Sequence, residues 1–357
     1  MAKIDAWGSI KIDNYENIFN EFGLEKFKDF NIADHYLMRR KLIIAHRDFS
    51  KIKNAIENKE KFLQLTGIAS TGSLHFGHKV DVDFFKLFKQ LGAKGKFCVC
   101  DIDGYVSRPK VSNINEAKEM AVKNIADVLA LGLDEDDIYV QSRKEQEYYQ
   151  LSYEISKKIT MNMFEAIYGH VDLGKVSAVL LQIADILHIQ LPFMYGKAPT
   201  ITGIGLEQDP HARITRDVSK RIDYDVNVPS FFYFIHQSGL KEGSKMSSSE
   251  PDTAIFLSDS PQEAKRKINR SFTGGRDSVE EQRERGGKPD ICKVYEIQKF
   301  HNPDDKFLKE TDEGCRSGKL LCGECKQNCV KFVQELLQEH QKKYEKNLQI
   351  AEKIVYG

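Results

Sequence analysis

Two histidines lie three residues apart in the segment His75-Phe76-Gly77-His78, which directly follows a loop of small residues over 66–73. At this spacing both imidazoles can project from one face of the first turn of a helix. Backbone N–H groups at such a helix start attract anions, and Gly72 and Gly77 let a ligand approach the backbone closely. Imidazole N–H groups can also donate hydrogen bonds to a triphosphate as negative charge grows at its α-phosphorus. The segment therefore predicts a site for nucleotide phosphates, although taken alone it also fits a turn with two surface histidines.

A second segment suited to phosphate is Lys245-Met246-Ser247-Ser248-Ser249, within a loop over 239–250. Lys245 offers a compact positive charge, and the serine hydroxyls offer hydrogen-bond donors to a departing pyrophosphate. Gly239 and Gly243 permit the loop to close over a ligand. Taken alone, this segment also fits a solvated linker.

Asp185 is a lone carboxylate within the apolar segment 176–191. An ionised group is costly inside an apolar helix unless a partner compensates it. Asp185 is therefore a candidate acceptor for a buried ligand. The alternative is a carboxylate on an exposed helix face, or one paired with Lys175 or His188.

The composition narrows the class of protein that carries these residues. The chain has 357 residues, and its 53 Lys and Arg balance its 53 Asp and Glu. This balance argues against a polybasic nucleic-acid coat or a membrane-surface protein, while a local basic face for RNA remains possible. The first 20 residues hold no apolar signal region, and no apolar run approaches the ~18 residues of a membrane span. We expect a cytoplasmic protein whose seven cysteines are metal ligands or free thiols.

The elements that must position these residues begin with a strand at 62–65 and the loop at 66–73. A helix over 76–91 and a second strand at 96–100 complete a β–loop–α–β unit, the building block of a parallel sheet. The expected fold class is α/β, with a Rossmann-type parallel-sheet catalytic domain that carries a helical insertion, followed by a mostly α-helical C-terminal domain. The expected boundaries are 1–60 for an N-terminal extension, 61–260 for the Rossmann-fold domain with its insertion at about 113–171, and 261–357 for the helical domain.

The two phosphate-handling segments, in this order and about 170 residues apart, resemble the HIGH and KMSKS signatures of class I aminoacyl-tRNA synthetases. The resemblance implies that an amino-acid carboxylate attacks the α-phosphate of ATP, with Mg²⁺ on the triphosphate, to give an aminoacyl-adenylate that tRNA then accepts. The implied catalytic residues are His75, His78, Lys245, Ser247 and Ser248. The expected ATP-binding residues are Ser70, Gly72, Gly77, His78, Gly205, Gln208, Lys245, Met246 and Ser249.

Other stretches are similar to tryptophanyl-tRNA synthetases, especially the archaeal and eukaryotic branch. They are Gly205–Asp217, Ala254–Asp259, Thr273–Arg276 and Glu280–Arg283, and matching stretches run from about Arg47 to Gln341. The resemblance implies charging of tRNA(Trp) with tryptophan, an anticodon-binding role for the helical domain, and a homodimer.

Specificity for an indole needs an apolar slot and one acceptor for the ring N–H. The helix around Asp185 resembles the A-D-I-L helix of bacterial tryptophanyl enzymes, which implies that Asp185 is this acceptor. We expect the slot to include Gln182, Thr202 and Ile204. Eukaryotic members instead use a Tyr and a Gln at two places that hold Leu65 and Cys98 in this chain.

Four cysteines in the C-terminal third follow the spacing C-x22-C-x6-C-x2-C, at Cys292, Cys315, Cys322 and Cys325. Two thiolates at x2 spacing can reach one metal centre, and four clustered cysteines commonly hold Zn²⁺. The spacing also resembles that of some tryptophanyl-tRNA synthetases with a [4Fe–4S] cluster, which we therefore expect here in preference to Zn²⁺. Free thiols are the alternative, and Cys329 is a possible substitute ligand in a zinc site. Cys98 and Cys100 are expected to be core residues of a strand.

Two other functions compete with a tryptophanyl enzyme. One is a related nucleotidyltransferase, such as a tyrosyl-tRNA synthetase or a small-molecule adenylyltransferase, although adenylyltransferases generally lack a tRNA-binding helical domain. The other is a non-catalytic RNA-binding relative. Both signatures are intact and Lys245 is present, which argues against a non-catalytic relative.

Overall fold

The computed structural model describes residues 15–28, 30–169 and 172–357. Its centre is a seven-stranded sheet in the order β1-β2-β7-β6-β3-β4-β5. The strands are β1 (Glu25–Lys26), β2 (Ile43–Arg47), β3 (Leu63–Ala69), β4 (Lys94–Cys100), β5 (Ile138–Val140), β6 (Thr200–Ile204) and β7 (Ser230–Phe234). The five strands from β7 to β5 run parallel, while β2 pairs antiparallel with β7 and with β1. The predicted α/β fold class with a parallel sheet is confirmed.

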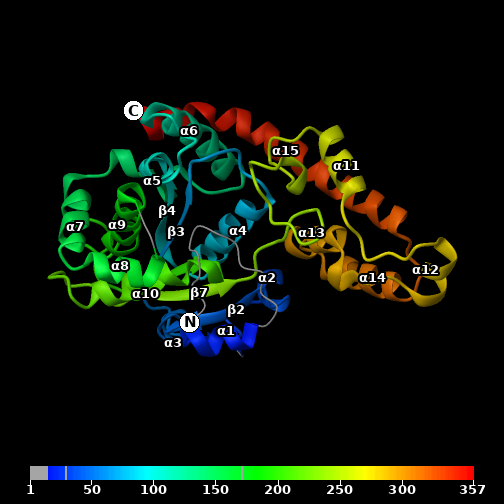
Figure 1. The fold of residues 1–357 in the computed structure, drawn as a ribbon, viewed down its shortest axis with the longest axis horizontal. Coiled ribbons are helices and arrows are strands. Elements are labelled where there is room, and N and C mark those ends of the chain that lie inside the picture. The colour runs from blue at the N-terminus through cyan, green and yellow to red at the C-terminus, as the bar shows by residue number, and fades with distance from the viewer. Residues whose placement is uncertain (1–14, 29, 170–171) are drawn as a thin grey trace.

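Helices cover both faces of this sheet (Figure 1). They are α1 (Tyr15–Phe22), α2 (Tyr36–Arg39), α3 (Phe49–Glu57), α4 (Phe76–Gln90), α5 (Asp101–Ser107), α6 (Ile114–Ala130), α7 (Gln146–Ser156), α8 (Met161–Tyr168), α9 (Leu173–His188), α10 (Asp209–Ser219), α11 (Pro261–Arg270), α12 (Val279–Arg285), α13 (Lys293–His301), α14 (Asp305–Arg316) and α15 (Cys322–Tyr356).

The β3–α4–β4 unit forms as predicted, but with longer strands. β3 continues through Ala69, so residues 66–69 are strand rather than loop, and each pairs in register with β4. Successive side chains of a strand point to opposite faces of the sheet. Phe97 and Val99 accordingly join the core formed with α4 and α6, whereas Cys98 packs with α9 on the other face.

Two regions for which no strand was predicted, the N-terminal extension and the helical insertion, also supply strands. Residues 43–47, within the predicted N-terminal extension, form β2 and pair with β7 through contacts such as Arg47 with Phe231. The predicted helical insertion contains α6, α7 and α8, but it also contributes β5, which pairs with the edge of β4. Both regions are therefore built into the same sheet as the predicted catalytic domain.

Residues 261–357 form α11 to α15, and they contribute no strand within the described part of the chain. Figure 1 shows α12 and α14 at the far end of this region, while α15 returns toward α6 beside the sheet. The 35 residues of α15 span about 52 Å at 1.5 Å per residue. His340 of α15 forms a 2.8 Å hydrogen bond with Asp127 of α6, which fixes the helix against the sheet domain.

Among the described residues, no helix has both the length and the apolar character that crossing a bilayer requires.

Candidate active site

A single cavity of about 1090 Å³ opens at the carboxyl ends of β3, β4 and β6. Ligands of open α/β sheets bind at this edge, where strand order and loops leave a crevice. His75, His78, Lys245 and Met246 all line this cavity. The two phosphate-handling segments, which lie far apart in the sequence, therefore face the same space.

Backbone contacts hold the two segments together. Phe76 donates its N–H to the carbonyl of Ile255 at 3.0 Å, and Leu257 donates to Leu74 at 2.9 Å. A Cβ added to Gly72 would lie 3.3 Å from Ser248, so the glycine loop reaches the serine loop directly. The chain that follows the 239–250 loop is thus bonded to the chain that leads into α4.

The two histidines are held at the N-terminus of α4 by backbone hydrogen bonds. The Nδ1 atom of His75 accepts from Gly77 N–H at 3.2 Å, and the Nδ1 atom of His78 accepts from His75 N–H at 3.1 Å. Their rings stack with centroids 4.0 Å apart. Burial lowers the pKa of His75 to about 4 and the pKa of His78 well below its usual value. Both rings are therefore neutral at pH 7, and because Nδ1 is an acceptor, each ring carries its proton on Nε2 as a donor.

The remaining predicted phosphate residues divide into two groups. Gly77 and Gln208 line the cavity, and the side chain of Gln208 accepts from Gly205 N–H at 3.3 Å. Ser70, Gly72, Gly205, Ser247, Ser248 and Ser249 do not line it. Ser70 is fully buried, and its hydroxyl donates to backbone carbonyls of Cys100 and Ala117. The hydroxyls of Ser247 and Ser249 bond to each other at 2.8 Å.

The cavity also contains a charged group that the sequence analysis missed. His236 follows β7 and bonds to Glu207 at 2.9 Å, and both residues line the cavity with Asp81. Burial acts to lower the pKa of His236, but its hydrogen bond to Glu207 together with the negative charges of Glu207 and Asp81 leaves this pKa raised. A Cβ added to Gly205 would lie 2.0 Å from His236, so this glycine makes room for the pair. The sequence feature that could have pointed to His236 is its position directly after the apolar run 231–235.

Asp185 lies at the part of the cavity where α9 covers β4. Its carboxylate is buried and accepts hydrogen bonds from Tyr139 at 2.7 Å, Tyr148 at 2.8 Å and Gln141 at 2.8 Å. Burial raises the pKa of Asp185 to about 6, and the three hydrogen bonds oppose this rise. Asp185 is therefore not on an exposed helix face, and the hydrogen bonds of its carboxylate are not made with Lys175 or His188. The side chain of His188 instead bonds to backbone carbonyls of α9.

The other predicted slot residues line the same cavity as Asp185, namely Gln182, Thr202 and Ile204. Thr202 pairs with Leu65 across β6 and β3, so both side chains point to the face that α9 covers. The hydroxyl of Thr202 is buried and has no hydrogen-bond partner among the described residues. This part of the cavity combines apolar walls with a few polar groups, which is the character of a pocket for an apolar ring.

The four C-terminal cysteines line a second, small cavity of about 10 Å³ between α12, α13, α14 and α15. Cβ atoms added to Gly275 and Gly287 would lie 2.8 Å from the sulfurs of Cys322 and Cys315, so these sulfurs pack on bare backbone. Gln282 also lines the cavity, and its buried amide nitrogen has no hydrogen-bond partner among the described residues. Cys329 is fully buried and does not line this cavity.

The four sulfurs of this cavity do not form a tight group. In the described part of the chain, Cys98, Cys100 and Asp185 form the one group of three metal-ligand side chains whose ligand atoms all lie within 4.8 Å of one another. No three of the four C-terminal sulfurs are therefore that close. Sulfurs around a tetrahedral Zn²⁺ with bonds of about 2.3 Å would lie about 3.8 Å apart. As they lie here, the four sulfurs are more widely spaced than around one bound Zn²⁺.

Comparisons with known proteins agree with this geometry. The sequence pattern of the class I tRNA synthetases (W and Y) matches residues 57–338. The tryptophan–tRNA ligase of Aeropyrum pernix is 39% identical over 366 residues, covering 99% of this chain and 98% of the relative. That of Methanocaldococcus jannaschii is 36% identical over 371 residues, covering 100% and 99%.

Solved structures give the same result. The crystal structure of the Aeropyrum pernix tryptophanyl-tRNA synthetase matches with a TM-score of 0.89, covering 98% of each chain. The tryptophanyl-tRNA synthetase of Giardia lamblia matches with a TM-score of 0.85 at 26% identity, covering 96% of each chain.

Proposed function

This chain belongs to the class I tRNA synthetases (W and Y), and we propose that it is the tryptophan-specific kind. It activates tryptophan with ATP to tryptophanyl-adenylate and transfers the tryptophanyl group to the 3′ end of tRNA(Trp). The observation that carries this proposal is the shared cavity, which joins the two signature segments to an apolar pocket with one buried carboxylate. The relatives at 36% and 39% identity are tryptophan–tRNA ligases, which favours this amino acid over tyrosine.

The chemistry needs no covalent enzyme intermediate, so the protein contributes orientation and electrostatic stabilisation. The neutral His75 and His78 would donate hydrogen bonds from Nε2–H to the phosphate oxygens. Lys245 would stabilise the negative charge of the departing pyrophosphate. Asp185 would accept the indole N–H. Mg²⁺ accompanies the triphosphate as the family implies. We further propose that the enzyme works as a cytoplasmic homodimer.

The proposed function predicts exchange of labelled pyrophosphate into ATP that depends on tryptophan. Adenylate formation is reversible without tRNA, so the purified chain with Mg²⁺ and ATP suffices for this assay. Tyrosine and a no-amino-acid sample are the matched controls. Exchange with tyrosine but not tryptophan would select a tyrosyl enzyme, and no exchange with any amino acid would select a non-catalytic relative.

For the cysteine cavity we propose a [4Fe–4S] cluster held by Cys292, Cys315, Cys322 and Cys325. Two observations support it: the four sulfurs line one cavity with no three of them within 4.8 Å of one another, and four cysteines are the usual ligands of such a cluster. The unpartnered amide nitrogen of Gln282 would then find an acceptor in the cluster's sulfurs. A cluster at this place would join α13, α14 and α15, because its ligands come from the starts and ends of these helices.

We expect anaerobically purified protein to contain about four iron atoms per chain and to absorb broadly in the visible range. Cys322→Ser should lose most of this iron and absorbance, because it removes one of four ligands. Cys329→Ser is the matched control, since Cys329 lies outside the cavity. Stoichiometric zinc without iron, or equal iron in Cys322→Ser and wild type, would contradict the cluster.

A further inference from the structure

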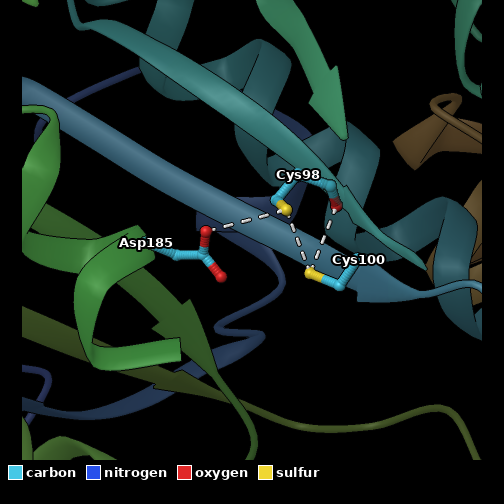
Figure 2. Close-up of side chains that lie close together, drawn as sticks. All are labelled: Cys98, Cys100 and Asp185. Atoms are coloured by element: carbon cyan, nitrogen blue, oxygen red, sulfur yellow. Dashed lines mark hydrogen bonds between the residues drawn. The ribbon is translucent and has the colours of Figure 1, made fainter. Parts of the chain in front are cut away.

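Cys98 and Cys100 pack in the core beside α9 as the sequence predicted, and they also lie next to a carboxylate. They stand two residues apart on β4, so both side chains point to the face that α9 covers. Figure 2 shows the two sulfurs and the carboxylate of Asp185 turned toward one another. The Cys98 sulfur lies 3.1 Å from the Cys100 sulfur and 3.9 Å from Asp185 Oδ1. Three ligand atoms of different residues thus converge on one point.

This point is open to the cavity. Cys98, Cys100 and Asp185 all line it, together with Gly67 of the adjacent strand β3. A Cβ added to Gly67 would lie 3.0 Å from the Cys98 Cβ and 3.5 Å from the Cys100 sulfur. Any other residue at 67 would therefore fill the space beside the two thiols. The glycine leaves them accessible to a small ligand that enters the cavity.

Asp185 is fixed in the orientation that the convergence needs. Three hydrogen bonds, from Tyr139, Tyr148 and Gln141, hold its carboxylate in place. Side chains already locked by other contacts lose little freedom when they bind a ligand. The carboxylate is thus preorganised, and the two thiols are the groups that remain to be deprotonated.

We propose that Cys98, Cys100 and Asp185 form a binding site for a soft divalent cation of the Zn²⁺ class in the amino-acid part of the cavity. Two thiolates and one carboxylate supply three of the four positions of a tetrahedral site, and the fourth faces the cavity. Thiolate ligands select soft cations over Mg²⁺, so the Mg²⁺ of the nucleotide does not compete for this site.

The charge balance of binding is favourable. In the free protein the hydrogens of the two thiols take part in the contacts from Cys100 to Cys98 and from Cys98 to Asp185. A divalent cation replaces these two protons, so the net charge of the three groups stays at minus one. Binding therefore releases two protons and becomes tighter as the pH rises.

The site has a consequence for the reaction, which rests on the proposed function. The cation would occupy the carboxylate that accepts the indole N–H, so cation and tryptophan exclude each other. The cation then inhibits the enzyme in competition with tryptophan and not with ATP.

The test titrates Cd²⁺ into the full chain, because a Cd²⁺–thiolate bond gives an ultraviolet charge-transfer band that counts thiolate ligands. Equilibrium dialysis without substrates gives the number of ions bound per chain. We expect wild type to bind one more Cd²⁺ than Cys98→Ser and than Cys100→Ser, whereas Cys329→Ser binds as many as wild type. If Cys98→Ser fails to fold because Cys98 is buried, Cys100→Ser still tests the site, since Cys100 is only half-buried. The four cysteines that line the C-terminal cavity are present in all four proteins, so their contribution cancels.

Equal Cd²⁺ numbers in wild type and in a folded Cys98→Ser or Cys100→Ser would overturn the site. Saturating tryptophan should release the additional ion, and its retention in a protein that performs tryptophan-dependent exchange would overturn its position. The ion count needs no substrate, so a failure of the proposed function appears in the exchange assay and not in this count.

Discussion

Replacing Lys245 by alanine is expected to slow tryptophan-dependent pyrophosphate exchange by roughly a hundred- to a thousandfold, with little change in thermal unfolding. Lys245 is exposed at the cavity. Burial acts to raise the pKa of Glu207, but its hydrogen bond to His236 and the positive charges of His236 and Lys245 leave this pKa lowered. Removing one electrostatic donor from a transition state typically costs about 3–4 kcal/mol. Because the side chain is not packed in a core, its truncation should leave the fold intact.

The loss should appear in kcat more than in the KM for ATP, because positive charge matters most while pyrophosphate departs. Lys241→Ala is the matched control. Lys241 is an exposed lysine of the same loop, but it does not line the cavity. Rates of both variants are measured by exchange at saturating tryptophan. Unchanged kinetics in Lys245→Ala, or an equal loss in Lys241→Ala, would remove Lys245 from the mechanism.

The parts of the fold that the sequence predicted are those with strong local patterns. The apolar spacing of α4 and the small residues before it predict the β3–α4–β4 unit, because both signals lie within forty residues. The strands β2, β5 and β7 were not predicted. β5 has three residues and β7 is buried on both faces, so neither shows the alternation that identifies a strand. β2 pairs with β7 far along the chain, which no local pattern reveals.

The site shows the same division. His75, His78 and Lys245 stand in recognisable segments, and the sequence could name them without knowing that they share a cavity. Cys98, Cys100 and His236 have no motif of their own. These residues gain a possible role only because tertiary packing places β4 next to Asp185 of α9 and places His236, after β7, next to Glu207. Single residues at strand ends are therefore the part of this site that only the structure could supply.

Asp185→Ala is expected to raise the KM for tryptophan in exchange roughly ten- to a hundredfold, with a much smaller change in the KM for ATP. The size follows from the loss of one hydrogen bond to a charged acceptor, about 1.5–3 kcal/mol. The substitution also leaves the donors of Tyr139, Tyr148 and Gln141 without their buried acceptor. Each such group costs about 1–3 kcal/mol, so the melting temperature should fall as well.

A matched variant separates these two effects. Tyr148→Phe removes one hydrogen bond to Asp185 at a fully buried ring that does not line the cavity. It should lower the melting temperature while leaving the carboxylate in place for the indole, so the KM for tryptophan should change little. Asp185 has a role in recognition only if its tryptophan effect far exceeds that of Tyr148→Phe. Parallel losses for tryptophan and ATP in Asp185→Ala would mean that the carboxylate acts through the fold alone.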